Sequence, residues 1–193
     1  MTSIGVVGAG SMGNGIAQVA AQAGYEVTLF DISEIQLDKA LSTIQKSLNK
    51  LQEKGKLKES PQAILARLRK TSRLEDFKSC QFVIEAASEN REVKFKLFRD
   101  LDGILPAGAI LTTNTSSISV TEIASKTKRP DCVAGMHFMN PVPIMTLVEG
   151  IRGLQTSDDC FKRVKSVAET MGKVFVEAKD APGFVVNRIL MPM

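Results

Sequence analysis

The sequence predicts an α/β fold in which helices cover both faces of a mainly parallel sheet. Short apolar segments at Ile4–Val7, Glu26–Phe30 and Phe82–Glu85 have the length and composition of buried strands, and helical patterns separate them. A glycine-rich turn, Gly8-Ala-Gly-Ser-Met-Gly13, follows the first strand. Strand, glycine turn, helix and strand in this order are typical of a doubly wound, Rossmann-like sheet.

The turn after the first strand has the spacing of a dinucleotide-binding loop. Gly8 permits the tight turn, Gly10 lets the backbone approach a pyrophosphate, and Gly13 allows the helix to pack closely on the strand. Ser11 and Met12 stand between these glycines at the helix N-terminus, where backbone N–H groups attract an anion. We therefore expect all five residues to contact a dinucleotide.

An acidic residue follows the second strand. Asp31 stands 18 positions after Gly13, close to the spacing of about 20 expected for the acid that binds a ribose. Its carboxylate would accept hydrogen bonds from ribose hydroxyls and repel a 2′-phosphate, and the next residue is Ile32 rather than an arginine. The sequence therefore predicts NAD as the cofactor.

The connection after the second strand is longer than a crossover between parallel strands needs. One helical stripe is apolar and consists of Leu37, Leu41, Ile44, Leu48 and Leu51. Gly55 ends this helix, and Pro61 opens a second one that we expect to continue through Arg69. We predict a helical hairpin inserted at about 34–70.

The predicted hairpin is strongly basic. Residues 39–73 hold ten lysines and arginines but only two acids, in a chain whose formal net charge is +4. A solvated helix face is the usual explanation of such a run, and a site for a phosphorylated ligand is the alternative. Because no aromatic residue accompanies the run, we do not expect a nucleic-acid partner.

Composition favours an ordinary globular protein, with 44% apolar and 24% charged residues. No apolar run approaches the roughly 18 residues of a membrane span, and the N-terminus lacks a secretory signal pattern. We expect a cytoplasmic protein without a membrane partner. The cysteines, Cys80, Cys132 and Cys160, lack metal-ligand spacing, so we predict neither a disulfide framework nor a metal site.

Strands and helices alternate again in the second half of the chain. The expected elements are a helix at Val93–Leu101, a strand at Ile110–Thr113, a helix at Thr121–Lys126, strands at Val133–Met136 and Met145–Glu149, a helix at Asp158–Met171, a strand at Val174–Val176 and a helix from Pro182. Ligands bind beyond the carboxyl ends of such strands. We therefore expect two groups of residues to border the cofactor cleft: Glu85, Ala86, Ala87 and Glu89 after one strand, and Asn114–Ser117 after the next. We count Asn114 and Ser116 among the cofactor contacts.

His137 is the single histidine, and histidine is the side chain whose ordinary pKa suits proton transfer near neutrality. A lone histidine is more often structural. However, His137 follows an expected strand and Glu149 ends the next one, and a carboxylate beside an imidazole fixes its tautomer and stabilises the imidazolium. Ser116 and Ser117 could bond a substrate hydroxyl, or could cap a helix instead.

Six motifs occur along the chain in a set order: Gly8–Gly13, Glu85–Asn90, Asn114–Ser117, His137–Pro143, Leu147–Glu149 and Pro182–Arg188. Together they resemble the L-3-hydroxyacyl-CoA dehydrogenase family, and most of all its bacterial 3-hydroxybutyryl-CoA members, over the whole chain. The resemblance implies NAD-dependent oxidation of a 3-hydroxyacyl-CoA, of short chain, to the 3-ketoacyl-CoA in fatty acid metabolism.

The same resemblance assigns roles to single residues. It makes His137 the general base and Glu149 its partner, with Ser116 and Asn187 at the substrate hydroxyl and carbonyl. The remaining assignments are Glu89, Lys94 and Asn140 on the nicotinamide side of the cofactor, and Ser47 and Lys54 on the hairpin where coenzyme A binds.

The family carries a second, all-helical domain that closes the cleft and forms the dimer interface. We expect residues 1–185 to form the NAD-binding domain and residues 186–193 to begin the helix that leads to this second domain, which is missing from the sequence. A full-length form would be a homo-oligomer, and without the second domain hydride transfer should be weak. Two alternatives stay open, a related sugar-acid (gulonate-type) dehydrogenase and a catalytically idle NAD-binding module.

Overall fold

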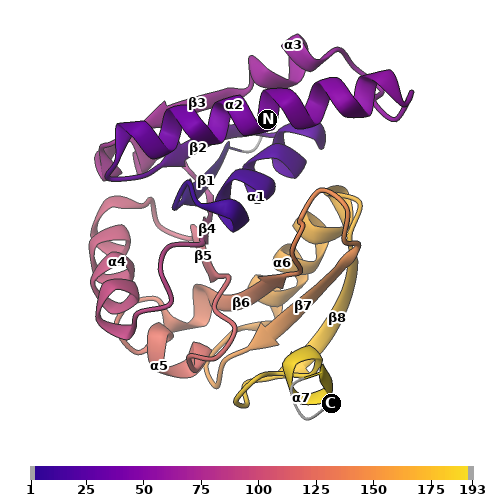
Figure 1. Cartoon of the computed structure of the whole chain (residues 1–193). Coiled ribbons are helices and arrows are strands. Elements are labelled where there is room, and N and C mark those ends of the chain that lie inside the picture. Colours follow the sequence, from indigo (N-terminus) through magenta and orange to yellow (C-terminus); the bar gives the residue numbers. More distant parts are fainter. Residues whose placement is uncertain (1–2, 191–193) are drawn as a thin grey trace.

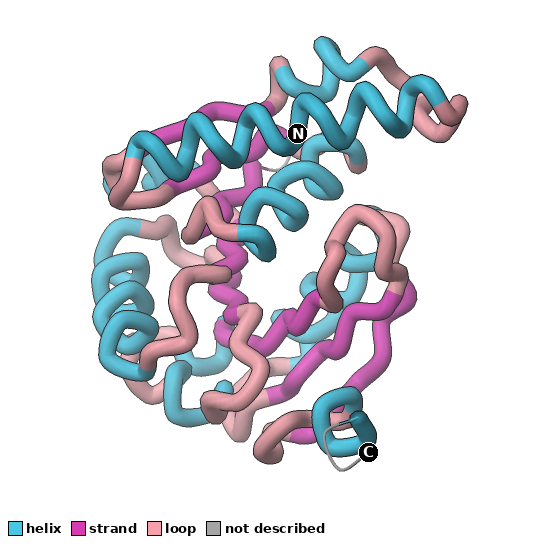
Figure 2. The backbone as a smooth tube through the Cα atoms, viewed as in Figure 1, coloured by secondary structure: helices cyan, strands magenta, loops and turns pink. Residues whose placement is uncertain are grey.

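In the computed structural model, which describes residues 3–190, eight strands form one sheet with helices on both faces (Figures 1 and 2). The strands are β1 (Ser3–Val7), β2 (Glu26–Phe30), β3 (Leu68–Thr71), β4 (Phe82–Glu85), β5 (Ile110–Thr113), β6 (Val133–Phe138), β7 (Leu147–Arg152) and β8 (Val174–Lys179). The α-helices are α1 (Ser11–Gln22), α2 (Glu34–Glu53), α3 (Pro61–Leu65), α4 (Arg91–Ile104), α5 (Val120–Ala124), α6 (Asp158–Thr170) and α7 (Val186–Leu190). Two 3₁₀ helices, η1 (Leu74–Ser79) and η2 (Pro130–Cys132), complete the described elements.

The strand order is β3-β2-β1-β4-β5-β6-β7-β8, and the first six strands are parallel. This is the order of a doubly wound sheet, in which the chain starts in the middle, winds to one edge and returns to wind toward the other. The predicted Rossmann-like α/β fold is therefore confirmed. The winding changes direction between β1 and β4, and ligands bind at such a point.

Two apolar layers hold the helices against the sheet. On one face, Ile16 of α1, Ile44 of α2 and Val164 of α6 belong to a single buried cluster. On the other face, Phe77 of η1 and Phe98 of α4 pack in a second cluster. All five side chains are fully buried, and each such burial contributes about 1.5–3 kcal/mol to folding. The sheet is therefore a rigid support for the loops at its edge.

Capping side chains fix where most helices begin. In α2, α3, α4, α5 and α6, the residue before the helix accepts a hydrogen bond from a backbone N–H of the first turn; these residues are Ser33, Ser60, Asn90, Ser119 and Ser157. Helix α1 differs, because its first flanking residue is Gly10 and no side chain caps it. Its N-terminal N–H groups are thus left for another partner.

The inserted hairpin is shorter than the sequence suggests. Helix α2 buries Leu37, Ile44 and Leu48 as expected, and Gly55 follows it with a φ of 63°. The expected continuation of the second helix through Arg69 is wrong, because α3 stops early and the chain enters β3, which pairs with β2. No helix within residues 3–190 is long and apolar enough to cross a membrane.

The C-terminal part of the sheet departs from the parallel pattern. Strand β7 runs antiparallel to β6, and β8 runs parallel to β7. Strands β6, β7 and β8 each extend beyond the expected ends, because every added residue pairs with a neighbouring strand. The last helix begins at Val186 rather than Pro182, because Gly183 and Phe184 have positive φ angles of 73° and 47°. Residues 191–193, where we expect this helix to continue, lie outside the described residues.

One carboxylate joins the end of β8 to the start of α5. Asp180 Oδ1 accepts from the Val120 N–H at 2.9 Å, and Oδ2 accepts from the Thr121 N–H and the Ser119 hydroxyl, both at 2.8 Å. Burial raises the pKa of Asp180, but the hydrogen bonds outweigh it and hold the pKa below its usual value. The ionised carboxylate therefore stabilises the fold.

We expect Asp180→Asn to lower the free energy of unfolding by about 1 kcal/mol at pH 7, the usual value of a helix cap. Because the folded-state pKa is depressed, this contribution is complete above the unfolded-state pKa of about 3.9 and is lost as the pH falls through the folded-state pKa. Urea unfolding at pH 7 and near pH 3 measures the difference. Glu53→Gln, at an exposed carboxylate, is the control, and a deficit of Asp180→Asn that persists undiminished near pH 3 contradicts the prediction.

Candidate functional site

The glycine turn leaves open space where a side chain would normally stand. A Cβ on Gly8 would lie 2.6 Å from the Ala86 carbonyl oxygen, and one on Gly13 would lie 1.7 Å from the Gly8 carbonyl oxygen. These two glycines are required by the protein's own packing. In contrast, a Cβ on Gly10 would meet no atom within 4 Å, so the space beside it is free for a ligand.

A cavity of about 490 Å³ extends from this turn to the end of β2. Gly10, Ser11 and Met12 line it at the uncapped start of α1, and Asp31 lines it at the end of β2. The Asp31 carboxylate accepts from the Ala9 N–H at 2.8 Å and from the Ser33 N–H at 3.0 Å. An open helix N-terminus for a pyrophosphate and an oriented acid for a ribose fit a dinucleotide.

A second pocket of about 380 Å³ adjoins the first at the carboxyl ends of the strands. The two share Met12, Ala86 and Ala87, so they form one cleft. The second pocket is lined by Met12, Ala86, Ala87, Glu89, Asn114, Ser116, His137, Phe138, Met139, Asn140 and Asn187. The structure thus brings together His137, Ser116, Asn187 and Asn140, which the sequence analysis placed at the reacting end of the site.

His137 and Glu149 face each other across the antiparallel pair of β6 and β7. His137 Nδ1 lies 2.8 Å from Glu149 Oε2, and the two residues are only 7% and 1% exposed. Neither residue stands at the expected strand end, because both strands continue and both side chains lie within the sheet. The two buried strands tolerate these polar side chains because His137 and Glu149 form a hydrogen bond with each other.

The second oxygen of Glu149 binds the beginning of α7. Oε1 accepts from the N–H groups of Val185 and Val186, each at 2.9 Å. Phe184 packs edge-on against the imidazole, with 5.7 Å between the ring centroids. Phe184 could not be predicted from the sequence, in which the Pro-Gly turn before it is the one signal of this contact. The pair is therefore held by the segment that carries Asn187.

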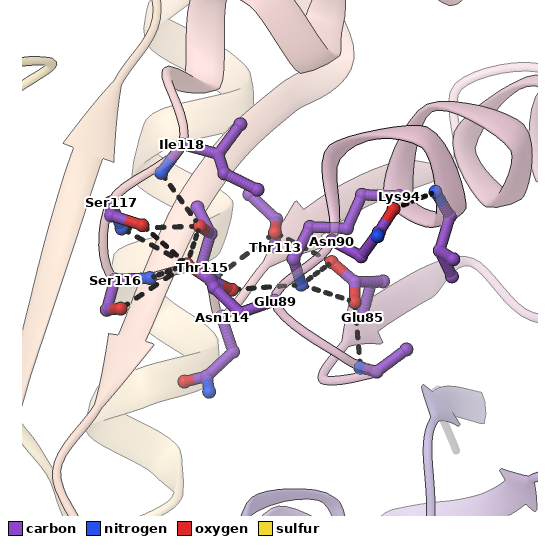
Figure 3. Close-up of polar contacts among 12 residues, drawn as sticks. Glu85, Glu89, Asn90, Lys94, Thr113, Asn114, Thr115, Ser116, Ser117 and Ile118 are labelled. Carbon is purple, nitrogen blue, oxygen red and sulfur yellow. Dashed lines mark hydrogen bonds and ion pairs between the residues drawn. The ribbon is translucent and has the colours of Figure 1, made fainter.

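Glu89 organises the turn after β5 (Figure 3). Its Oε1 accepts from the Thr115 hydroxyl at 2.5 Å, from the N–H groups of Ser116 and Ser117 at 2.9 and 3.2 Å, and from the hydroxyls of Ser117 and Ser116 at 3.0 and 3.3 Å. Burial raises the pKa of Glu89, but these bonds and Lys94 outweigh it and hold the pKa below its usual value. Ser119, and neither Ser116 nor Ser117, caps α5.

Lys94 lies beneath the cleft rather than on its wall. The residue is 1% exposed, and its ammonium donates to both oxygens of the buried Glu85 at 2.7 and 2.9 Å (Figure 3). It lies 3.5 Å from Glu89 Oε2. Thr113 also donates to Glu85, at 2.7 Å. Lys94 thus supports Glu89 from beneath the cleft, and its contact with the cofactor stays a prediction.

The remaining predicted residues lie in two places. Asn114 borders the second pocket, and its side-chain oxygen accepts from the Phe138 N–H at 2.8 Å, which ties β5 to β6. Ser47 and Lys54 lie on the α2 hairpin, half-buried and exposed respectively, and line neither part of the cleft. The structure does not bring these two residues to the His137 pocket.

Comparison with known proteins identifies the family of this chain. The model for the 3-hydroxyacyl-CoA dehydrogenase NAD binding domain matches residues 3–181. The chain belongs to this family. A relative from Deinococcus radiodurans, named as a probable 3-hydroxybutyryl-CoA dehydrogenase, is 51% identical over 189 residues, which are 98% of this chain and 68% of the relative. A 3-hydroxybutyryl-CoA dehydrogenase of Clostridioides difficile is 46% identical, with 98% and 68% covered.

A solved structure agrees with this assignment. The crystal structure of (S)-3-hydroxybutyryl-CoA dehydrogenase from Ralstonia eutropha superposes with a TM-score of 0.96 at 47% identity, covering 100% of this chain and 69% of that one. The chain thus spans about two thirds of the length of these relatives. The cofactor of the matched domain is NAD, as the glycine turn and Asp31 predict.

Gly10→Ala should separate cofactor binding from folding. Its φ of −68° suits alanine and the new methyl meets no protein atom, so the free energy of unfolding should change by less than about 0.5 kcal/mol. Because the methyl enters the space for the pyrophosphate, the Kd for NAD should rise about tenfold or more. Titration calorimetry and thermal unfolding measure both. Gly13→Ala is the contrasting variant and should lose stability as well; an unchanged Kd in Gly10→Ala contradicts the assignment.

Proposed function

We propose that this chain forms the NAD-binding part of an enzyme that oxidises a short-chain 3-hydroxyacyl-CoA, such as 3-hydroxybutyryl-CoA, to the 3-ketoacyl-CoA. The observation that carries the proposal is the His137–Glu149 pair at the end of a cleft that continues into a dinucleotide cavity. The names of the relatives support the short acyl chain. Family membership supports the thioester.

His137 is the general base in this proposal. An ionised Glu149 can only accept a hydrogen bond, so the proton of the neutral imidazole lies on Nδ1 and the lone pair lies on Nε2. Nε2 takes the proton of the 3-hydroxyl while the C3–H bonding electrons leave as hydride and the C3–O bond becomes a carbonyl. Bound NAD supplies the hydride acceptor.

Glu149 stabilises the charge that arrives on His137. Its carboxylate is anchored by two backbone N–H groups of the α7 segment in addition to Nδ1. The negative charge is therefore oriented before the imidazolium forms, and little reorganisation accompanies proton transfer. Ser116 and Asn187 come from different elements but line the same pocket, and we assign them to the substrate hydroxyl and carbonyl.

The hairpin offers positive charge to the phosphates of coenzyme A. Arg67 pairs with Glu59, and Lys70 pairs with Asp38. Among residues 3–190, no ion pair involves the other lysines of the hairpin, which are Lys39, Lys46, Lys50, Lys54, Lys56 and Lys58. We assign Ser47 and Lys54 to coenzyme A.

A hollow lies between the hairpin and the loop that follows Asn140. Its volume is about 400 Å³, and Lys56 and Lys58 line it together with Pro143 and Ile144. Because Asn140 lines the His137 pocket, this loop connects the proposed reacting end with the basic hairpin. A long thioester ligand could therefore follow the loop from one to the other.

We expect His137→Gln and Glu149→Gln each to reduce the rate of 3-hydroxybutyryl-CoA oxidation by about 10²- to 10⁴-fold. The first removes the base, and the second offers an amide N–H to Nδ1, which moves the imidazole proton to Nε2. Because the two residues act as a unit, the double variant should be little slower than either single one. Single-turnover NADH formation measures the rates.

NAD affinity is the control for these variants, since neither residue lines the dinucleotide cavity. It should change by less than about threefold, within about 0.7 kcal/mol. Undiminished turnover in His137→Gln removes the residue from the catalytic role. Loss of turnover together with equal loss of NAD binding assigns the effect to folding instead.

Lys54→Met should raise KM for 3-hydroxybutyryl-CoA about three- to tenfold, because one exposed contact to a phosphate is lost. The same variant should leave KM for 3-hydroxybutyryl pantetheine, which lacks the nucleotide phosphates, unchanged. Lys162→Met, at an exposed lysine of α6, is the matched control. Equal KM changes for both thioesters exclude Lys54 from the coenzyme A site, and faster oxidation of free hydroxy acids than of the thioester favours the sugar-acid alternative.

A further inference from the structure

Glu89 is a carboxylate in the reacting pocket that the proposed proton transfer does not use. It lines the pocket together with His137, Ser116 and Asn140, and 39% of its side chain is exposed. Its Oε1 accepts hydrogen bonds from the Thr115–Ser117 turn. Among the described residues, the one partner of Oε2 is the Lys94 ammonium, 3.5 Å away. A charge is thus retained at the pocket wall although a neutral amide could accept the same turn bonds.

The cluster around Glu89 carries a net negative charge. Lys94 is 2.7 and 2.9 Å from the oxygens of the fully buried Glu85 but 3.5 Å from Glu89 (Figure 3). The positive charge of Lys94 therefore neutralises mainly Glu85 rather than Glu89. Nearby Arg91 is paired with Glu122 and adds no net charge. One negative charge remains, and it resides on the member that borders the pocket.

The placement of His137 determines where the nicotinamide ring must bind. The proton leaves the oxygen of the alcohol and the hydride leaves the carbon bonded to it. The ring carbon that accepts the hydride must therefore share a pocket with the base. That pocket is the one that Glu89 lines. The ring carries one positive charge when oxidised and none when reduced, whereas the rest of the dinucleotide is unchanged.

We propose that the Glu89 carboxylate makes the site prefer the oxidised cofactor over the reduced one; this rests on the proposed function, which puts the ring beside His137. The attraction exists only while the ring is charged, so Glu89 tightens binding of NAD⁺ but not of NADH. Because the Glu89 side chain is partly exposed and water screens its charge, the preference amounts to about three- to tenfold in the ratio of dissociation constants.

This preference has a consequence for the reaction. Tighter binding of the oxidised form lowers the reduction potential of the bound cofactor, by about 30 mV for each tenfold in the ratio for two electrons. Glu89 therefore disfavours bound NADH relative to bound NAD⁺, and it makes bound NADH the stronger donor in the reverse direction.

The test compares the dissociation constants of NAD⁺ and NADH for the chain and for three variants. NADH binding is followed by its fluorescence, and NAD⁺ binding by its competition with NADH. Glu89→Gln keeps an acceptor for the turn but removes the charge, so Kd for NAD⁺ should rise about three- to tenfold more than Kd for NADH. Glu89→Asp keeps the charge and should preserve the ratio. Glu92→Gln, at an exposed carboxylate in the first turn of α4, is the control and should leave the ratio unchanged.

The outcomes separate charge from structure. If Glu89→Gln changes both constants by the same factor, Glu89 acts only by shaping the turn and the proposal is overturned. If Glu89→Gln does not fold, the parent alone decides, because the NAD⁺ preference should decline between about 0.05 and about 1 M salt when the attraction is electrostatic. A ratio independent of salt then overturns it. Failure of the parent to bind either dinucleotide contradicts the proposed function itself.

Discussion

The buried carboxylate of Glu149 is the constraint on which the rest of the site depends. Removing an ionised carboxylate from water costs several kcal/mol unless it is fully hydrogen-bonded, and Glu149 is 1% exposed. Three donors satisfy it, namely Nδ1 of His137 and the N–H groups of Val185 and Val186. Because β7 runs antiparallel to β6, Glu149 lies opposite His137. The chain after β8 then returns to Glu149 and donates the two remaining hydrogen bonds. The antiparallel direction of β7 thus places the Glu149 carboxylate beside His137.

In the proposed reaction, two carboxylates at the cleft each face a positive charge that appears or disappears during hydride transfer. Glu149 faces the positive charge that forms on His137, and Glu89 faces the positive charge that the cofactor ring loses. Both are oriented by backbone N–H groups, which Glu89 receives from Ser116 and Ser117. Neither has to rearrange when charge moves, and this preorganisation gives such groups their effect in a partly desolvated pocket.

The sequence was most informative where chemistry is local. The Gly8–Gly13 turn and Asp31 could be predicted because each residue has a steric or charge requirement of its own. Strand β3 could not, because Leu68–Thr71 is polar at its centre and becomes a strand only by pairing with β2. Only the family resemblance placed Lys94 at the cofactor, and nothing in the sequence indicates that this lysine is buried. Its burial depends on an ion pair with the buried Glu85, nine positions earlier. Such long-range pairing has no periodic signal.

The Asp31 carboxylate both lines the dinucleotide cavity and forms hydrogen bonds that hold the fold. Its two oxygens accept from Ala9 in the glycine turn and from Ser33 before α2, so the carboxylate is fixed before any ribose arrives. The same bonds hold the turn against β2, because Asp31 directly follows that strand and Ser33 directly precedes α2. The residue that we expect to discriminate against a 2′-phosphate therefore also sets the path of the chain into the basic hairpin. A change of cofactor preference at this position has to replace those two backbone bonds as well as the charge.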